Sequence, residues 1–228
     1  MTKESKKCHL CGELFDTTSS DPDLKLSREH VPPRQFYPKG IRKKENLNLE
    51  TAPSHRECNE SYREDEEYFY HALYPLVKDN NPNMGNVIFQ DFKRRSTKPQ
   101  TPAMLRNISK TASKITDGGI HLPAGKVQFS LDEYRLQRVV IKIARGVLSL
   151  NGIPFIKSSS CIDIRLCQSE LEVPELYQLS WQASETPCGD YHKVFSYKYF
   201  YFEGHHYVTL LFWESVMYCL CFNDSFAL

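Results

Sequence analysis

Two pairs of metal-ligating side chains with the same spacing constrain the fold more than any other feature of the chain. Cys8 and Cys11 lie in a Cys-His-Leu-Cys-Gly run, which is typical of a tight turn that presents two thiolates, with Gly12 easing the backbone after the second. His55 and Cys58 repeat the spacing in the first turn of an expected helix. The four side chains form a Cys3His pattern that predicts a tetrahedral structural zinc ion. Because 43 residues separate the pairs, we expect a folded segment inside the zinc-closed loop.

The composition is that of an ordinary soluble protein. Of 228 residues, 40% are hydrophobic and 25% charged, and no apolar run approaches the roughly 18 residues that would span a bilayer. The first seven residues, MTKESKK, are charged with no apolar stretch behind them, so we expect no secretory signal, no membrane association and a cytoplasmic location. In that compartment metal ligation explains the zinc pattern better than disulfides do. Five cysteines are left as expected reduced thiols: Cys161, Cys167, Cys188, Cys219 and Cys221.

A net charge of +1 hides a small asymmetry between the two halves of the chain. Residues 1–114 carry 20 Lys and Arg against 16 Asp and Glu, whereas residues 115–228 carry 9 against 12. The first half is therefore mildly biased toward nucleic acid, but the bias is too small to indicate DNA binding by itself.

Turn and capping signals divide the chain into expected elements. In the first half we expect strands over 24–31 and 47–51, a helix from His55 that is introduced by a Ser54/Glu57 capping box, and helices over 85–95 and 102–114. A linker is expected over 116–125. A second capping box, Ser130/Glu133, opens a helix that stops at 151–152. Strand-like runs follow, the last three as an antiparallel meander: 161–167, 177–181, 192–202, 206–213 and 216–222.

The segment enclosed by the zinc pattern carries the residues that suggest a family. It contains Ser27-Arg28-Glu29-His30-Val31-Pro32-Pro33-Arg34 and then Glu45-Asn46-Leu47-Asn48-Leu49, and Asn59 follows the second ligand pair. Over about residues 5–70 this order resembles the HNH nuclease family, in its zinc-bearing branch. The resemblance implies a ββα-metal, or treble-clef, module over 1–80, followed by a helical connector over 81–120. An accessory domain over 121–228, with a helix on an antiparallel sheet, would complete an α+β protein.

The resemblance also implies roles for individual residues. His30 would be the general base that takes a proton from water. Glu29 and Asn59 would supply oxygen ligands to a catalytic Mg²⁺ or Mn²⁺. Asn46 would orient His30 or pin the loop between the strands. Three positions depart from the common family pattern: Glu29 stands where many members have Asp, Asn59 where many have His, and His55 where the zinc-bearing branch has Cys.

Several charged or aromatic groups have two interpretations. Arg28, Arg34, Arg42 and Lys43 would hold phosphate oxygens of DNA, or are solvated surface residues. The acidic run of Glu60 and residues 64–67 is expected to face away from nucleic acid, or toward a partner. The aromatic strand around 195–202 is expected to be a partly buried strand, with a base-stacking platform as the alternative. His192, His205 and His206 are expected to be solvated turn residues.

These features favour a divalent-metal-dependent HNH endonuclease that acts on DNA, with a C-terminal domain that regulates, oligomerises or docks a partner. Family analogy suggests a restriction or anti-phage defence effector, paired with an ATPase or sensor subunit. The alternative from another class is a non-catalytic zinc module that binds nucleic acid or a protein.

Overall fold

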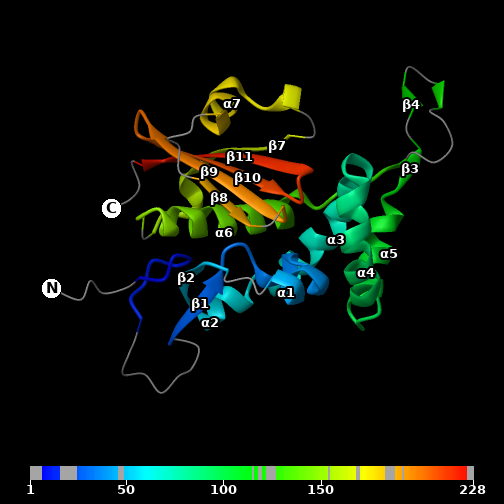
Figure 1. Ribbon diagram of the computed structural model, residues 1–228, viewed down its shortest axis with the longest axis horizontal. Helices are drawn as coiled ribbons and strands as arrows, with labels where there is room; N and C mark the ends of the chain where they lie inside the picture. Colours follow the sequence, from blue (N-terminus) through cyan, green and yellow to red (C-terminus); the bar gives the residue numbers. More distant parts are fainter. Residues whose placement is uncertain are drawn as a thin grey trace.

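Helices and antiparallel strands are mixed along the chain in the computed structural model (Figure 1), which confirms the α+β class. The structure describes residues 7–15, 25–45, 49–114, 116–117, 120–121, 127–153, 155–167, 170–182, 188–191 and 193–224. Within these residues every strand pairs antiparallel with its neighbours. No helix among them is both long enough and apolar enough to cross a membrane.

The N-terminal part builds two strands and a helix beside the Cys8 turn. Strand β1 (Leu26–His30) pairs with β2 (Thr51–His55), with Leu26 opposite His55 and His30 opposite Thr51. The connection holds a short 3-10 helix, η1 (Arg34–Phe36), and α1 (Lys39–Glu45). From β2 the chain enters α2 (Arg56–Glu60) at once, and α3 (Arg63–Asn80) follows two residues later.

The second strand lies later in the sequence than predicted, over 51–55 instead of 47–51, and it contains Pro53. Proline has no N–H to donate, but each strand of a two-stranded sheet has a free edge, so Pro53 is tolerated there. Its carbonyl accepts a hydrogen bond from the His9 N–H at 3.0 Å. Because β2 runs through Ser54, the capping box expected at that residue does not form, and His55 is the N-cap of α2.

Two helices and two small hairpins connect the halves of the molecule. The helices match the predicted pair, with shifted ends, and the hairpins occupy part of the predicted linker. Their bounds are α4 (Pro82–Ser96), α5 (Thr101–Lys110), β3 (Ser113–Lys114), β4 (Thr116–Asp117), β5 (Ile120–His121) and β6 (Val127–Gln128). The rest of the predicted linker, residues 118–119 and 122–125, lies outside the described residues.

The C-terminal half is a helix on an antiparallel sheet, as predicted. Helix α6 (Glu133–Leu150) is capped by Asp132, whose side chain accepts from Arg135 N–H at 3.2 Å; the predicted cap Ser130 lies too early. The sheet has the order β7-β11-β10-β9-β8. Its strands are β7 (Cys161–Cys167), β8 (Cys188–Tyr191), β9 (Phe195–Phe202), β10 (His205–Phe212) and β11 (Val216–Asn223). Two 3-10 turns, η2 (Ser158–Ser160) and η3 (Glu170–Glu172), precede β7 and α7.

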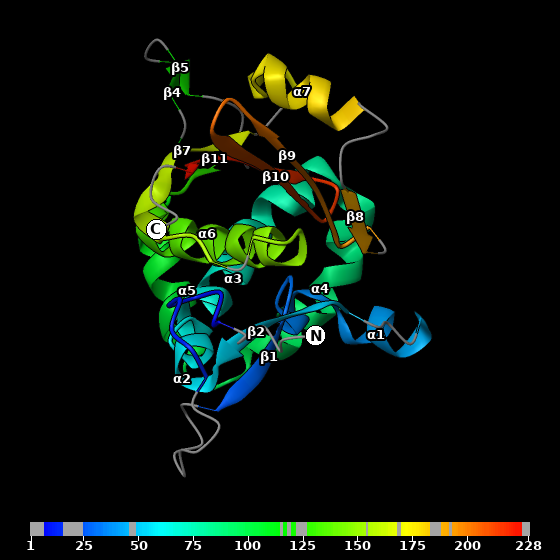
Figure 2. The same cartoon turned by 90° about the vertical axis from the view of Figure 1, so that its left-hand side faces the viewer.

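The strand predicted over 177–181 is wrong, because this segment is helix α7 (Glu175–Gln182). Pro174 starts the helix by accepting from the N–H groups of Tyr177 and Gln178. Tyr177 and Ser180 are buried three residues apart, which is a helical and not a strand period. In Figures 1 and 2, α7 covers the face of the sheet opposite α6.

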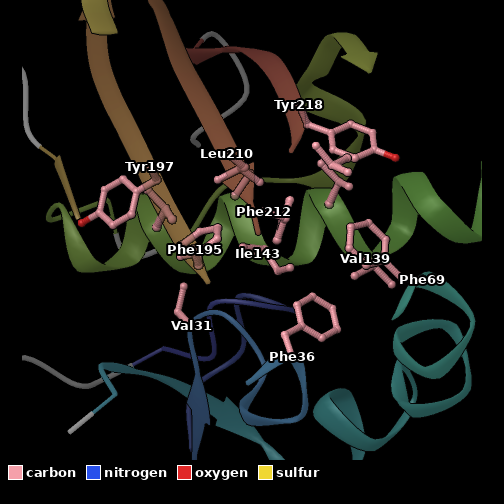
Figure 3. Packing of buried hydrophobic residues seen from close by; sticks show 14 of the residues in the cluster. Val31, Phe36, Phe69, Val139, Ile143, Phe195, Tyr197, Leu210, Phe212 and Tyr218 are labelled. Atoms are coloured by element: carbon pink, nitrogen blue, oxygen red, sulfur yellow. The ribbon is translucent and has the colours of Figure 1, made fainter. Parts of the chain in front are cut away.

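Helix α6 lies between the sheet and the N-terminal strands and contacts both (Figures 1 and 2). Figure 3 shows Phe195, Leu210 and Phe212 packed on one side of α6, and Val31 and Phe36 on the other. These residues belong to a single buried cluster that runs from Val31 to Phe222. The cluster thus draws on both sides of the predicted boundaries near 80 and 120, and the boundaries themselves stay predictions.

Candidate metal centre and the oxygen cradle beside it

The four predicted zinc ligands come together in one cluster. The ligand atoms of Cys8, Cys11, His55 and Cys58 all lie within 4.8 Å of one another. His55 Nδ1 faces two of the sulfurs, at 3.3 Å from Cys11 Sγ and 3.9 Å from Cys58 Sγ. The His55 N–H points to Cys8 Sγ at 3.3 Å. Three soft thiolates and an imidazole at these separations suit a tetrahedral structural metal such as zinc.

The turn that carries Cys8 and Cys11 is fixed by backbone contacts. Gly12 N–H donates to Cys8 O at 2.8 Å, and Gly12 has a φ of +84°, which an L side chain adopts only with strain. A Cβ at Gly12 would also lie 2.8 Å from the Phe155 ring. The turn is tied to β2 by His9, whose Nδ1 lies 2.8 Å from Pro53 O.

The donor set is one that needs a cation. Burial and the neighbouring thiols of Cys8 and Cys11 raise the pKa of the Cys58 thiol to about 12. Packing three sulfur ligands this closely is favourable when a cation neutralises them as thiolates. The chemistry of the cluster therefore agrees with the predicted zinc site.

His30 ends β1 and is half-buried. Desolvation lowers the pKa of its imidazole, and the nearby positive charge of Arg34 lowers it further, while a hydrogen bond with the Leu49 backbone acts in the opposite direction. The side chain is thus partly exposed, and the positive charge of Arg34 acts on it. Asn46, predicted to assist His30, lies outside the described residues.

Glu29 and Asn59 converge on one point, and that point is held by a lysine. Lys142 Nζ, from α6, donates to Glu29 Oε1 at 3.1 Å, to Asn59 Oδ1 at 2.7 Å and to Glu66 Oε1 at 2.5 Å. We call these three oxygens the oxygen cradle. The same Nζ lies 5.1 Å from the centroid of the Tyr62 ring. The two oxygen ligands predicted for a catalytic metal are therefore brought together, but around a side-chain ammonium.

All three charged side chains of the cradle are buried. Lys142 is 2% exposed, Glu66 6% and Glu29 7%. Desolvation raises the pKa of Glu29 to about 7; the positive charge of Lys142 opposes this increase, and the negative charge of Glu66 adds to it. Two carboxylates buried this close together need a neutralising partner, and Lys142 supplies one.

Lys142 and Glu66 were not among the predicted site residues, although the sequence carries a signal for one of them. Lys142 lies three residues after Val139 and four before Gly146, on a buried stripe of α6 that is bordered by Arg138 and Arg145. A lysine in a buried stripe requires a buried anion. The sequence did not identify that anion, because Glu66 is 76 residues away.

The acidic run was expected to face away from nucleic acid, or toward a partner; its residues 65–67 contact other parts of this chain, whereas Glu60 and Glu64 are exposed. Asp65 and residues 66–67 are buried. Arg135 Nε donates to Asp65 Oδ1 at 2.6 Å, and Arg138 contacts the same carboxylate. Glu67 accepts from Thr101 Oγ1 at 2.8 Å. Helix α6 and the connector therefore neutralise the face of α3 that the sequence left unexplained.

Three predicted phosphate-binding arginines lie on or near the surface. Arg28 and Arg34 are exposed and Arg42 is half-buried. Burial lowers the pKa of Arg42, as do the charges of Arg34, Arg95 and Arg94, so these guanidinium groups are near neighbours. The side chain of Lys43 lies outside the described residues.

The aromatic strand is partly buried, as expected, but one histidine differs. Tyr197 and Tyr199 are buried, whereas Tyr201 and Phe202 are exposed. His206 is also buried, which makes the solvated-turn expectation wrong for it. Its Nδ1 lies 3.0 Å from Tyr199 Oη and its Nε2 lies 3.3 Å from Asp224 Oδ1. His205 is half-buried, with Nδ1 2.8 Å from Glu203 O, and His192 lies outside the described residues.

The remaining predicted thiols are free where the structure describes them, namely at Cys161, Cys167, Cys219 and Cys221. In the comparisons with known proteins, no family model, no curated protein and no solved structure matches this chain.

Proposed function

We propose that the chain is an HNH-type endonuclease that hydrolyses phosphodiester bonds in DNA, with His30 as the general base. The observation that carries the proposal is the convergence of Glu29 and Asn59 on one atom, Lys142 Nζ, at 3.1 and 2.7 Å. Glu29 comes from β1, where it precedes the proposed base His30, and Asn59 comes from the last turn of α2. A zinc-held strand, strand and helix would serve to keep that arrangement rigid.

The proposed reaction consumes one water for each cut. His30 takes a proton from the water, and the water oxygen attacks phosphorus. The bond from phosphorus to the leaving oxygen then breaks, and a proton passes to that leaving oxygen. A depressed imidazole pKa keeps His30 neutral near pH 7, which is the state that accepts a proton. Arg34 is exposed and its charge acts on His30, and we assign it to a phosphate oxygen in this proposal.

A catalytic Mg²⁺ or Mn²⁺ does not fit the cradle as it stands. Carboxylate and amide oxygens are the right donors for such ions, but Lys142 already fills the space between them. The reaction above therefore includes no step that uses a metal. The family resemblance alone supports the proposed setting, a restriction or anti-phage defence effector working with an ATPase or sensor subunit, or as a homo-oligomer.

A second function is favoured by that same lysine. If Lys142 holds the cradle permanently, the segment is a non-catalytic zinc module that binds nucleic acid or a protein. The ion pairs that α6 makes with α3 and with Glu29 of β1 are what such a purely structural role would need.

A plasmid-nicking assay with Mg²⁺ or Mn²⁺ separates the two functions. We expect His30→Ala to lower cleavage roughly 100-fold or more, the usual loss when a general base is removed. His205→Ala, which removes a histidine from the first position of β10, is the matched control and should cut normally. Cleavage that persists in His30→Ala would overturn the proposed mechanism. No cleavage by the wild type or by Lys142→Ala would favour the binding module.

A further inference from the structure

Lys142 occupies the position that a divalent cation would need, and every hydrogen of its ammonium is used. A lysine ammonium has three N–H donors, and the cradle offers three oxygens at 2.5 to 3.1 Å. With 2% of its surface exposed, Nζ has no donor left and no path to a phosphate. The Lys142 ammonium therefore does not contact the substrate in the way that a catalytic metal would.

The main chain of α6 is held close to the cradle by a glycine. A Cβ at Gly146, one turn after Lys142, would lie 2.6 Å from Val31 Cγ2. Val31 follows the Glu29-His30 pair directly. Only a residue without a side chain lets the helix approach this strand so closely, so the approach that delivers Lys142 is built into α6.

Neighbouring residues hold the helix on both sides of Lys142. Arg138 contacts Asp65, and its guanidinium lies 4.8 Å from the Tyr62 ring centroid. Arg145 donates to Leu10 O in the zinc turn at 2.6 Å. The other side of α6 is packed against the sheet, where Val139, Val140 and Ala144 are fully buried. Displacing the whole helix would break the core, so the group able to leave the cradle is the lysine side chain.

We propose that Lys142 is the resident cation of the Glu29, Asn59 and Glu66 cradle, and that it competes with a divalent metal for these oxygens. While Lys142 is in place the cradle binds no Mg²⁺ or Mn²⁺. When its ammonium is removed, two carboxylates and an amide remain, which are ligands of the kind these ions bind. This inference adds a control on metal access to the proposed nuclease site, and as a statement about metal binding it stands without the nuclease activity.

The test is Mn²⁺ binding to zinc-loaded protein, followed by electron paramagnetic resonance and by thermal unfolding. In the wild type we expect no Mn²⁺ bound in a Glu29-dependent manner and no change in Tm. In Lys142→Ala we expect Mn²⁺ to bind at least roughly tenfold more tightly, because the competing occupant is gone. The Tm of this variant should rise by roughly 5 to 10 °C when Mn²⁺ is present at about 100 times its dissociation constant.

Three controls make the result specific. Arg138→Ala removes a basic residue one turn earlier on α6 that contacts Asp65 and not the cradle, so Mn²⁺ should leave its Tm unchanged. The double variant Lys142→Ala with Glu29→Gln should lose the Mn²⁺ response. Zinc content should stay the same in each protein, which shows that Mn²⁺ does not enter the thiolate cluster.

The inference fails if wild-type protein binds Mn²⁺ at the cradle, as judged by loss of binding in Glu29→Gln. That measurement needs no Lys142 variant, so the inference is testable even if Lys142→Ala does not fold. It also fails if folded Lys142→Ala gains no Mn²⁺ site. The nuclease proposal fails separately: Lys142→Ala would then bind Mn²⁺ and still leave plasmid DNA intact.

Discussion

At the scale of single residues, Cys58 is the zinc ligand whose loss should be most informative. It belongs to the cluster and directly precedes Asn59 in α2, so removing its thiolate tests the metal site and the position of the cradle together. We expect Cys58→Ser to weaken zinc binding by more than the roughly 10- to 100-fold that losing an outer hydrogen-bond partner of a metal ligand costs. The Tm should fall with it, because zinc binding contributes folding free energy.

Elemental analysis after dialysis against a weak chelator measures this effect, with calorimetry for the Tm. Cys161→Ser is the matched control, since the Cys161 thiol lies outside the cluster and donates to Asp163 O. Full zinc content in Cys58→Ser would contradict the ligand set.

The residues that the sequence predicted well are those whose chemistry shows in short spacings. Cys8 and Cys11, like His55 and Cys58, reveal themselves as pairs because zinc restricts how ligands are spaced. Lys142 and Glu29 carry no such signal, since 113 residues separate them and only the packing of α6 against the N-terminal part of the chain joins them. The cradle was therefore partly predicted: the oxygens of Glu29 and Asn59 were identified, whereas the Glu66 oxygen and the occupant Lys142 were not.

At the scale of elements, the contact between Gly146 of α6 and Val31, which follows β1, decides how closely α6 approaches the N-terminal strands. Replacing glycine by alanine within a helix ordinarily stabilises it by up to about 1 kcal/mol. At Gly146 we expect the opposite, a loss of about 1 to 3 kcal/mol, because the new Cβ would lie 2.6 Å from Val31 Cγ2. Urea denaturation of Gly146→Ala measures the free energy of unfolding.

A double-mutant cycle shows whether this contact is the cause. Val31→Ala removes both methyl groups that the new Cβ would meet, so Gly146→Ala should cost much less in that background. Equal costs in the two backgrounds would mean that the helix does not rely on this close approach.

Elements were predictable where local pattern and tertiary position agree. Strands β9, β10 and β11 are separated by short turns, and each pairs with the next one along the chain. The meander could therefore be predicted from the sequence. The prediction for the α7 segment failed because its aromatic and aliphatic residues resemble those of a strand. In the structure, Leu176 and Leu179 are exposed on the outer surface of this helix. Its helical structure depends on Pro174 at the start and on packing against the sheet. A short apolar run alone does not distinguish a helix from a strand.

At the scale of the whole molecule, the buried cluster ties the zinc module to the C-terminal sheet. Trp213, in the turn after β10, is fully buried and donates from Nε1 to Phe36 O at 3.2 Å. Phe36 also stacks on Phe69 of α3, with ring centroids 5.2 Å apart. Sequence signals for linkers, such as Asp117-Gly118-Gly119, describe where the chain can turn. They do not tell whether the segments on either side share a core.

A shared core predicts that the zinc module and the sheet unfold together. The experiment uses Trp181→Phe, which leaves Trp213 as the single tryptophan, and follows heat unfolding by its fluorescence, by far-UV circular dichroism and by zinc release to a dye. We expect the three midpoints to coincide, since coincidence of probes is the mark of one cooperative unit. A strong chelator should shift all of them downward together, because binding only to the folded state stabilises the whole unit. Zinc release well below the loss of the sheet signal would show instead that residues 1–80 and 121–228 unfold as separate domains, and that the close packing around α6 does not couple them.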